Sequence, residues 1–211
     1  MINTTRLRCT IGWLGMLLPW IVCILAIAYH HLLSPPPSIS ATYYYEACIT
    51  PFMVVLGSAS LLLFSYKGYE AIDDIICSIT GLCGLLVCLF PCNSIKGDLV
   101  GTFQIPENVS NILHSIAAIG FFGLLSYNSL FLFTKSSGEK TLRKKIRNAI
   151  YIICGIGMVL AMIGLVAIII FNLPIAGGIW WAEMILLTFF GISWLTKADC
   201  YWWLFCDKME K

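Results

Sequence analysis

The hydrophobic positions of this chain fall into six runs, which are separated by polar segments rich in Pro, Gly and charged residues. An α-helix of about 20 apolar residues crosses a hydrocarbon core of roughly 30 Å. The pattern therefore predicts a single all-α integral membrane domain over residues 1–211, built as a six-transmembrane-helix bundle. The predicted spans are residues 11–33, 47–66, 75–89, 112–133, 149–173 and 179–195.

The positions of the cations predict the direction of these helices. Lys and Arg collect in the cytoplasmic loops of membrane proteins. With the amino terminus inside, twelve of the thirteen Lys and Arg residues fall in inner segments, and only Lys96 falls in an outer one. The densest group, residues 143–147, lies in the inner connector after the fourth span. We therefore expect both termini to be cytoplasmic, in a multi-pass protein of the cell membrane.

Composition supports a membrane protein. The chain is 59% apolar and 11% charged, with a mean hydropathy of +0.88, whereas a soluble domain is about 25% charged. The only basic cluster is a short connector beside a membrane helix, so we expect no nucleic-acid partner. A cleaved signal peptide is the alternative for the first run, because Ala26 and Ala28 are spaced as in a cleavage site after a basic start.

Ten cysteines would suggest a disulfide framework in a small secreted protein. Here several lie inside apolar runs, where they act as small packing residues. Cys48 and Cys92 fall near the same outer boundary, and a disulfide between them is an open alternative. No motif for zinc, nucleotide or another cofactor is present, so we expect neither a metal nor a cofactor.

Ionisable residues inside a membrane are costly, which makes them the first candidates for a functional site. His114 in the fourth span and Glu183 in the sixth both fall in the outer half. With Tyr43, Tyr44 and Tyr45 of the first outer loop they would supply a base, a carboxylate to orient it and phenolic donors. The alternative is that His114 and Glu183 are structural hydrogen-bonding residues and that the tyrosines form an interfacial belt.

Two further groups of ionisable residues have structural alternatives. Asp73 and Asp74 form an acidic cluster at the inner end of the third span, where the helix dipole favours negative charge. Pairing with the basic residues 143–147 is a second interpretation. His30 and His31 close the first span on the same side as His114, and a histidine cluster for haem or zinc would need all three, although no spacing supports it.

Several segments together resemble a known family. They read SISATYYYEACI, LLLFSYKGYEAIDDIICSITG, CLFP, LHSIAAIGFF, LFLFTK, KKIRNAIYIICG and WWAEMILLTFFGISWLTKAD, and they cover roughly residues 38–199. In this order they resemble a family of six-span bacterial membrane proteins of unknown function. That family is more distantly similar to the superfamily of the damage-regulated autophagy modulator (DRAM) and the post-GPI-attachment lipid-remodelling proteins.

The resemblance implies a membrane protein that acts on or with lipids. It draws attention to the tyrosines at 43–45, Tyr69, Asp73, His114 and Glu183. Relatives carry an arginine shortly after the tyrosines, where this chain has the apolar Ile49 or its neighbours. That departure argues against an anion-binding role for the loop.

These observations leave three classes of function. The first is a lipid-binding, sensing or accessory protein without catalysis, with membrane lipids as its partners. The second is an intramembrane lipid hydrolase or acyl-transfer enzyme that uses His114 and Glu183. The third is a small transporter or channel, which the almost wholly apolar spans disfavour. Small residues spaced four apart, as at Cys77 and Gly81, predict close helix packing, within the chain or in a homo- or hetero-oligomer.

Overall fold

The structure is a computed structural model, and it describes residues 4–31, 34–93, 99–135 and 141–199. These ranges contain six helices that are each long and apolar enough to cross a membrane. The helices are α1 (Thr4–His30), α2 (Glu46–Phe64), α3 (Ala71–Leu89), α4 (Glu107–Tyr127), α5 (Leu142–Ile170) and α6 (Gly178–Lys197). The predicted six-helix membrane bundle is confirmed.

Shorter elements fill the connectors. A 3₁₀-helix, η1 (Ser40–Tyr44), precedes α2, and a π-helix, η2 (Asn128–Leu132), continues α4. The connector between α3 and α4 contains a small antiparallel hairpin of β1 (Leu99–Val100) and β2 (Ile105–Pro106), which the hydrophobic pattern did not predict.

Polar residues start two helices earlier than predicted. Glu70 and Asp73 form a reciprocal capping box, so α3 begins at Ala71 in the polar connector. Thr141 caps α5 by accepting a hydrogen bond from the Lys144 backbone N–H at 3.3 Å. The basic residues 143–147 are therefore the first turns of α5 and not an extended connector, because Lys and Arg are good helix formers once a cap is present.

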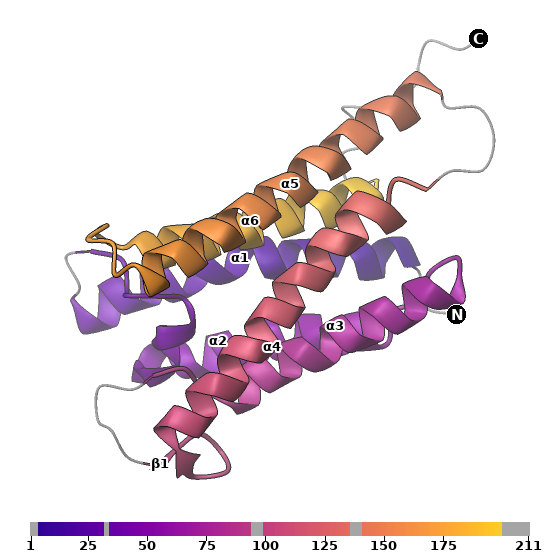
Figure 1. Ribbon diagram of the computed structural model, residues 1–211. Helices are drawn as coiled ribbons and strands as arrows, with labels where there is room; N and C mark the ends of the chain where they lie inside the picture. Colours follow the sequence, from indigo (N-terminus) through magenta and orange to yellow (C-terminus); the bar gives the residue numbers. More distant parts are fainter. Residues whose placement is uncertain (1–3, 32–33, 94–98, 136–140, 200–211) are drawn as a thin grey trace.

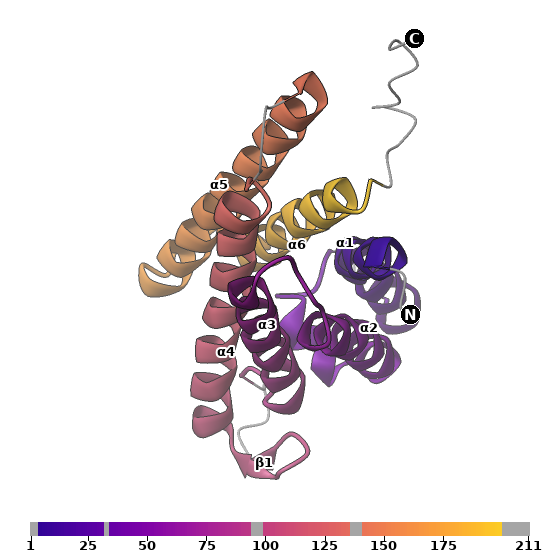
Figure 2. The same cartoon turned by 90° about the vertical axis from the view of Figure 1, so that its right-hand side faces the viewer.

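The helices form a closed ring in which each packs against the next and α6 returns to α1. Figure 1 shows α1, α5 and α6 above α2 and α3, with α4 crossing obliquely from the lower helices up toward α5, and Figure 2 shows the same arrangement turned by 90°. Contact between α4 and α5 is the least extensive of any neighbouring pair. This contact is the weakest point in the wall of the ring.

Small residues bring the helices together, as the four-residue spacing predicts. A Cβ added to Gly81 would lie 2.5 Å from the backbone of Ser60 and Phe64 on α2, and one added to Gly157 would lie 2.3 Å from the Phe189 ring on α6. Gly81 and Gly157 therefore each pack against a neighbouring helix of the same chain.

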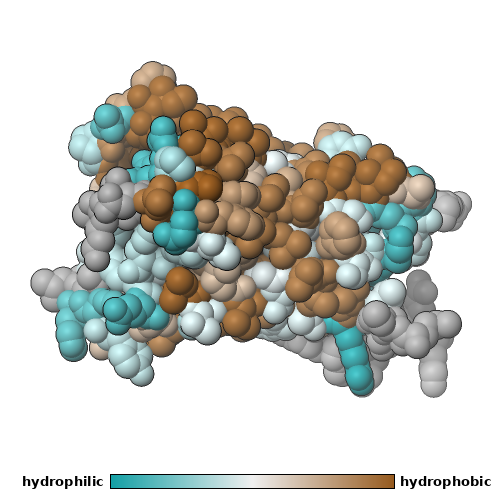
Figure 3. All heavy atoms as spheres, turned by 90° about the horizontal axis from the view of Figure 1, so that it is seen from below, coloured by the Kyte–Doolittle hydropathy of each residue, from teal (hydrophilic) through white to brown (hydrophobic). Residues whose placement is uncertain are grey.

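The bundle has two chemically different ends. The first turn of α1, the last turn of α6, and the connectors α2–α3 and α4–α5 lie at one end, on the right in Figure 1. Every Lys and Arg in the described ranges lies there, and we call it the basic end. The opposite end, with η1, the end of α3 and the start of α4, is called the cavity end. Seen from below in Figure 3, hydrophobic residues dominate the middle, and strongly hydrophilic ones gather toward both ends.

Candidate functional site

A cavity of about 410 Å³ lies inside the ring, toward the cavity end. All six helices contribute side chains to its wall, and residues 37–41 together with Cys92 and Asn93 close it at the end. Ile119 on α4 and Ile169 on α5 both line it, and 53% and 56% of their surfaces are exposed. The cavity therefore reaches the outer surface of the bundle between α4 and α5, where the ring is weakest.

Glu183 lines this cavity from the second turn of α6. Its Oε2 accepts a hydrogen bond from the Ile39 backbone N–H at 2.5 Å, and its Oε1 lies 3.5 Å from the Ser40 hydroxyl. Ile39 immediately precedes η1, and its N–H has no acceptor within that short helix. The Glu183 carboxylate supplies this acceptor. One consequence is structural: Glu183 attaches the connector between α1 and α2 to α6.

His114 lines the same cavity from α4, and 6% of its surface is exposed. Its Nδ1 lies 2.8 Å from the carbonyl oxygen of Phe90, the residue that ends α3. A carbonyl only accepts, so Nδ1 carries the proton and, in the neutral ring, Nε2 is the acceptor. Ser110, one turn earlier, donates its hydroxyl to the Pro91 carbonyl at 2.7 Å. These two residues satisfy carbonyls that the end of α3 leaves free.

Two of the candidate site residues lie together. His114 and Glu183 line one cavity, and each also has a hydrogen bond to backbone. Residues that were not predicted join them at the polar end of the cavity, namely Ser38, Ser40, Asn93 and Asn111. Serine and asparagine are ordinary loop residues, so only the folded chain shows that they converge.

The three tyrosines lie beside the cavity and not in its wall. Tyr44 donates its hydroxyl to the Cys92 carbonyl, and its ring packs edge-to-face with Tyr43 at 5.4 Å. The Tyr45 ring lies 4.9 Å from that of His30. Burial, assisted by the nearby Cys92 and Glu107, raises the pKa of Tyr44. These contacts join η1 to the connector after α3 and so support the cavity from outside.

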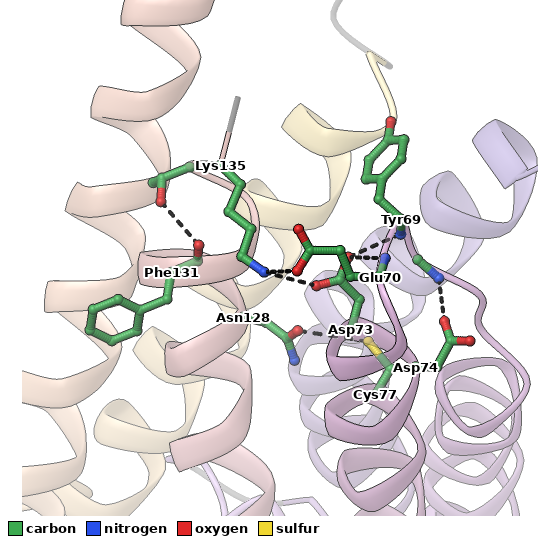
Figure 4. Close-up of polar contacts among 10 residues, drawn as sticks. Tyr69, Glu70, Asp73, Asp74, Cys77, Asn128, Phe131 and Lys135 are labelled. Atoms are coloured by element: carbon green, nitrogen blue, oxygen red, sulfur yellow. Dashed lines mark hydrogen bonds and ion pairs between the residues drawn. The ribbon is translucent and has the colours of Figure 1, made fainter. Parts of the chain in front are cut away.

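The predicted acidic cluster at the basic end caps a helix (Figure 4). Asp73 accepts backbone N–H groups from Tyr69 at 3.0 Å and Glu70 at 3.3 Å. Asp74 accepts from the Gly68 N–H at 2.7 Å and lies 3.3 Å from the Lys67 ammonium. This arrangement agrees with the helix-terminus interpretation.

The alternative pairing of this cluster with residues 143–147 is not what forms. Lys135 lies 2.6 Å from the Glu70 carboxylate and 3.9 Å from Asp73. Arg143 and Arg147 instead contact Asp199 at 3.4 and 2.9 Å. The residues just after α6 therefore supply the negative charge beside the start of α5.

Cysteine and histidine do not combine into a metal centre in the described ranges, where no group of three His, Cys, Asp or Glu residues could hold a metal ion. Cys48 and Cys92 are both free thiols, so the disulfide considered between them is not formed. The Cys48 thiol lies 3.4 Å from the Val22 carbonyl on α1. Its place in the core is that of a packing residue.

No protein-family model, curated protein or solved structure matches the chain. The resemblance to a six-span bacterial membrane protein family, and more distantly to the DRAM superfamily, therefore stays a prediction.

Proposed function

We propose that this protein binds one amphiphilic lipid in the cavity inside the ring. The observation that carries the proposal is the cavity itself: its volume of about 410 Å³ falls within the range of roughly 300–1,000 Å³ that is usual for ligand pockets. Its opening between α4 and α5 lies in the hydrophobic middle of the outer surface, which is the side from which a lipid chain would enter.

The lining is divided as an amphiphile would require. Deep in the ring the wall is apolar, with Phe52, Leu56, Phe121 and Leu187 among its residues. The polar residues, including His114 and Glu183, gather where the cavity meets the connectors of the cavity end. A chain lying along the apolar wall would place its polar group beside them, at the depth of the membrane boundary.

The distribution of Lys and Arg supports lipid binding from one particular leaflet of the membrane. If the basic end faces the cytoplasm, as the cation rule predicts, the cavity opens within the outer leaflet. The proposal is therefore binding of an outer-leaflet lipid in a cell membrane. Lipid sensing or an accessory role in a larger complex would build on the same binding step.

Native mass spectrometry of the protein released from detergent tests the proposal. Leu165 lines the cavity from α5, whereas Leu160 on the same helix does not and is 62% exposed. Leu165→Trp fills the cavity, and Leu160→Trp makes the same change outside it. We expect one lipid-sized adduct on the wild type and on Leu160→Trp, and loss of that adduct in Leu165→Trp. Equal adducts on both variants, or none on the wild type, would overturn the proposal.

One observation favours an enzyme as the second candidate, since His114 and Glu183 face the same cavity. A hydrolase or acyl-transfer protein would use His114 as the base. The test is turnover of a long-chain ester by the purified protein. Turnover that His114→Gln abolishes while the lipid adduct persists would establish catalysis; an adduct without turnover would leave binding as the function.

A further inference from the structure

Among the described residues, the wall of the cavity contains one acidic side chain, that of Glu183, and no Lys or Arg. The Lys and Arg residues of the described ranges all belong to the basic end. In the sequence, the connectors of the cavity end hold one cation, Lys96, which lies outside the described ranges and is accompanied by Asp98. A ligand head in this cavity would therefore lie beside the Glu183 carboxyl group.

Cys92 is an ionisable residue of the cavity wall that lies outside the membrane-spanning helices. Burial, and next the negative charge of Glu183, raise the pKa of the Cys92 thiol to about 12. The thiol is therefore neutral at neutral pH and adds no charge of its own to this end of the cavity.

Glu183 also keeps hydrogen-bonding capacity. When ionised, the Glu183 carboxylate offers about four acceptor positions. The Ile39 N–H takes one and the Ser40 backbone N–H also interacts with the carboxylate, while the contact of Oε1 with the Ser40 hydroxyl, at 3.5 Å, is at the limit of a hydrogen bond. At least one acceptor position of the ionised carboxylate is therefore available to a donor that enters the cavity.

We infer that the cavity selects amphiphiles by their head group, binding a single chain that ends in an ammonium group most tightly, an uncharged hydroxyl next and an anionic group least. The inference rests on the proposed lipid binding. An ammonium donates to the free acceptor of Glu183 and complements its charge, and a hydroxyl donates without the charge. A carboxylate or phosphate has no donor to offer and is repelled by Glu183.

The test uses an amine, an alcohol and a carboxylic acid of one chain length, bound to the full-length protein in nanodiscs of zwitterionic phospholipid. Binding to Leu165→Trp nanodiscs is subtracted, so that partitioning into the bilayer does not count. Because a hydrogen bond to a charged group contributes more than a neutral one, we expect the amine to bind roughly tenfold or more tightly than the acid. Equal affinities, or tighter binding of the acid, would overturn the inference.

Two carboxylates at the same end provide a matched comparison. Glu183→Gln keeps an acceptor for the Ile39 N–H but removes the charge, and we expect it to bring the amine and acid within about threefold of each other. Glu46→Gln makes the same change at an exposed residue that does not line the cavity, and it should leave the ratio unchanged. If both variants change the ratio equally, Glu183 is not the selecting group.

The outcomes separate the two proposals. If none of the three chains binds above the Leu165→Trp baseline, the proposed function fails. If all three bind with equal affinity, lipid binding stands and only the head-group selection fails. Should Glu183→Gln not fold, the order of the three chains on the wild type still decides the inference.

Discussion

Asp73 near the basic end and Glu183 near the cavity end both hold a connector by accepting backbone N–H groups, but their surroundings differ. Asp73 has the Lys135 ammonium 3.9 Å away and shares a space of about 10 Å³, the size of one water, with Lys197. Glu183 has no Lys or Arg of the described ranges at its end and borders a cavity of about 410 Å³. The buried Oδ1 of Asp73 accepts no hydrogen bond from the described residues, but the space beside it has room for no more than a water, whereas Glu183 borders a volume large enough for a ligand.

The comparison depends most on the basic end and the cavity end lying on opposite sides of the membrane. Glu46 at the cavity end and Lys67 at the basic end are both exposed. We expect a membrane-impermeant thiol reagent to label Glu46→Cys on intact cells and to label Lys67→Cys only after the cells are opened. The wild type, which already carries cysteines, sets the background. Labelling of Lys67→Cys on intact cells would reverse the orientation.

Removing the acceptor at Glu183 has the next largest expected effect. In Glu183→Ala the N–H of the buried Ile39 loses its partner, and an unsatisfied buried donor costs about 1–3 kcal/mol. We expect the free energy of unfolding in detergent to fall by that amount. Glu183→Gln retains an acceptor and should recover most of the loss. Equal losses in both variants would show that the charge, and not the hydrogen bond, holds the loop.

Asp73→Ala should cost less, because it removes one member of a capping box at a partly hydrated helix end. Loss of a cap lowers stability by about 0.5–2 kcal/mol. Asp73→Asn keeps an acceptor for the Tyr69 and Glu70 N–H groups and should lie between the wild type and alanine. Head-group selection by the cavity should be the same in both variants, since Asp73 lies at the other end; a changed ratio of amine to acid binding would contradict this separation.

The smallest effect is expected at Lys135. Its hydrogen bond to Glu70, more than the charges around it, raises its pKa above the ordinary value of 10.5. A raised pKa in the folded state means that the pair contributes fully below the ordinary value and is lost as pH rises through the folded one. The stability difference between the wild type and Lys135→Met should therefore be constant from neutral pH up to pH 10.5 and shrink above it. A difference that grows with pH would show the opposite sign.

Sequence alone predicted the parts of the molecule that depend on local pattern. The six helices follow from long apolar runs. His114 and Glu183 were chosen as candidates because an ionisable group at membrane depth is costly, and both line the cavity. The helix starts at Ala71 and Leu142 were missed because they depend on caps, which hydropathy does not report.

Other features were beyond reach because they depend on tertiary contacts. The tyrosines at 43–45 were expected in the site for their chemistry, yet Ser38 and Ser40, which carry no such signal, line the cavity. Asn111 joins them from the start of α4, a segment far away in the sequence. Only the contacts of Ile39 and Ser40 with Glu183 on α6, together with the packing of α3 against α4, bring these residues together, and no pattern along the chain encodes them.

Covalent trapping of a bound chain tests the central claim most directly. A long-chain amine that carries a diazirine near its end would be irradiated in nanodiscs with the wild-type protein, and the labelled peptides mapped. If the lipid chain occupies the cavity, we expect labels on cavity residues such as Phe121 and Leu187. These labels should be lost in Leu165→Trp but not in Leu160→Trp. Labels confined to the outward face of α5, at Ile153, Leu160 and Ile163, would show that the chain remains in the bilayer and that the cavity holds no lipid.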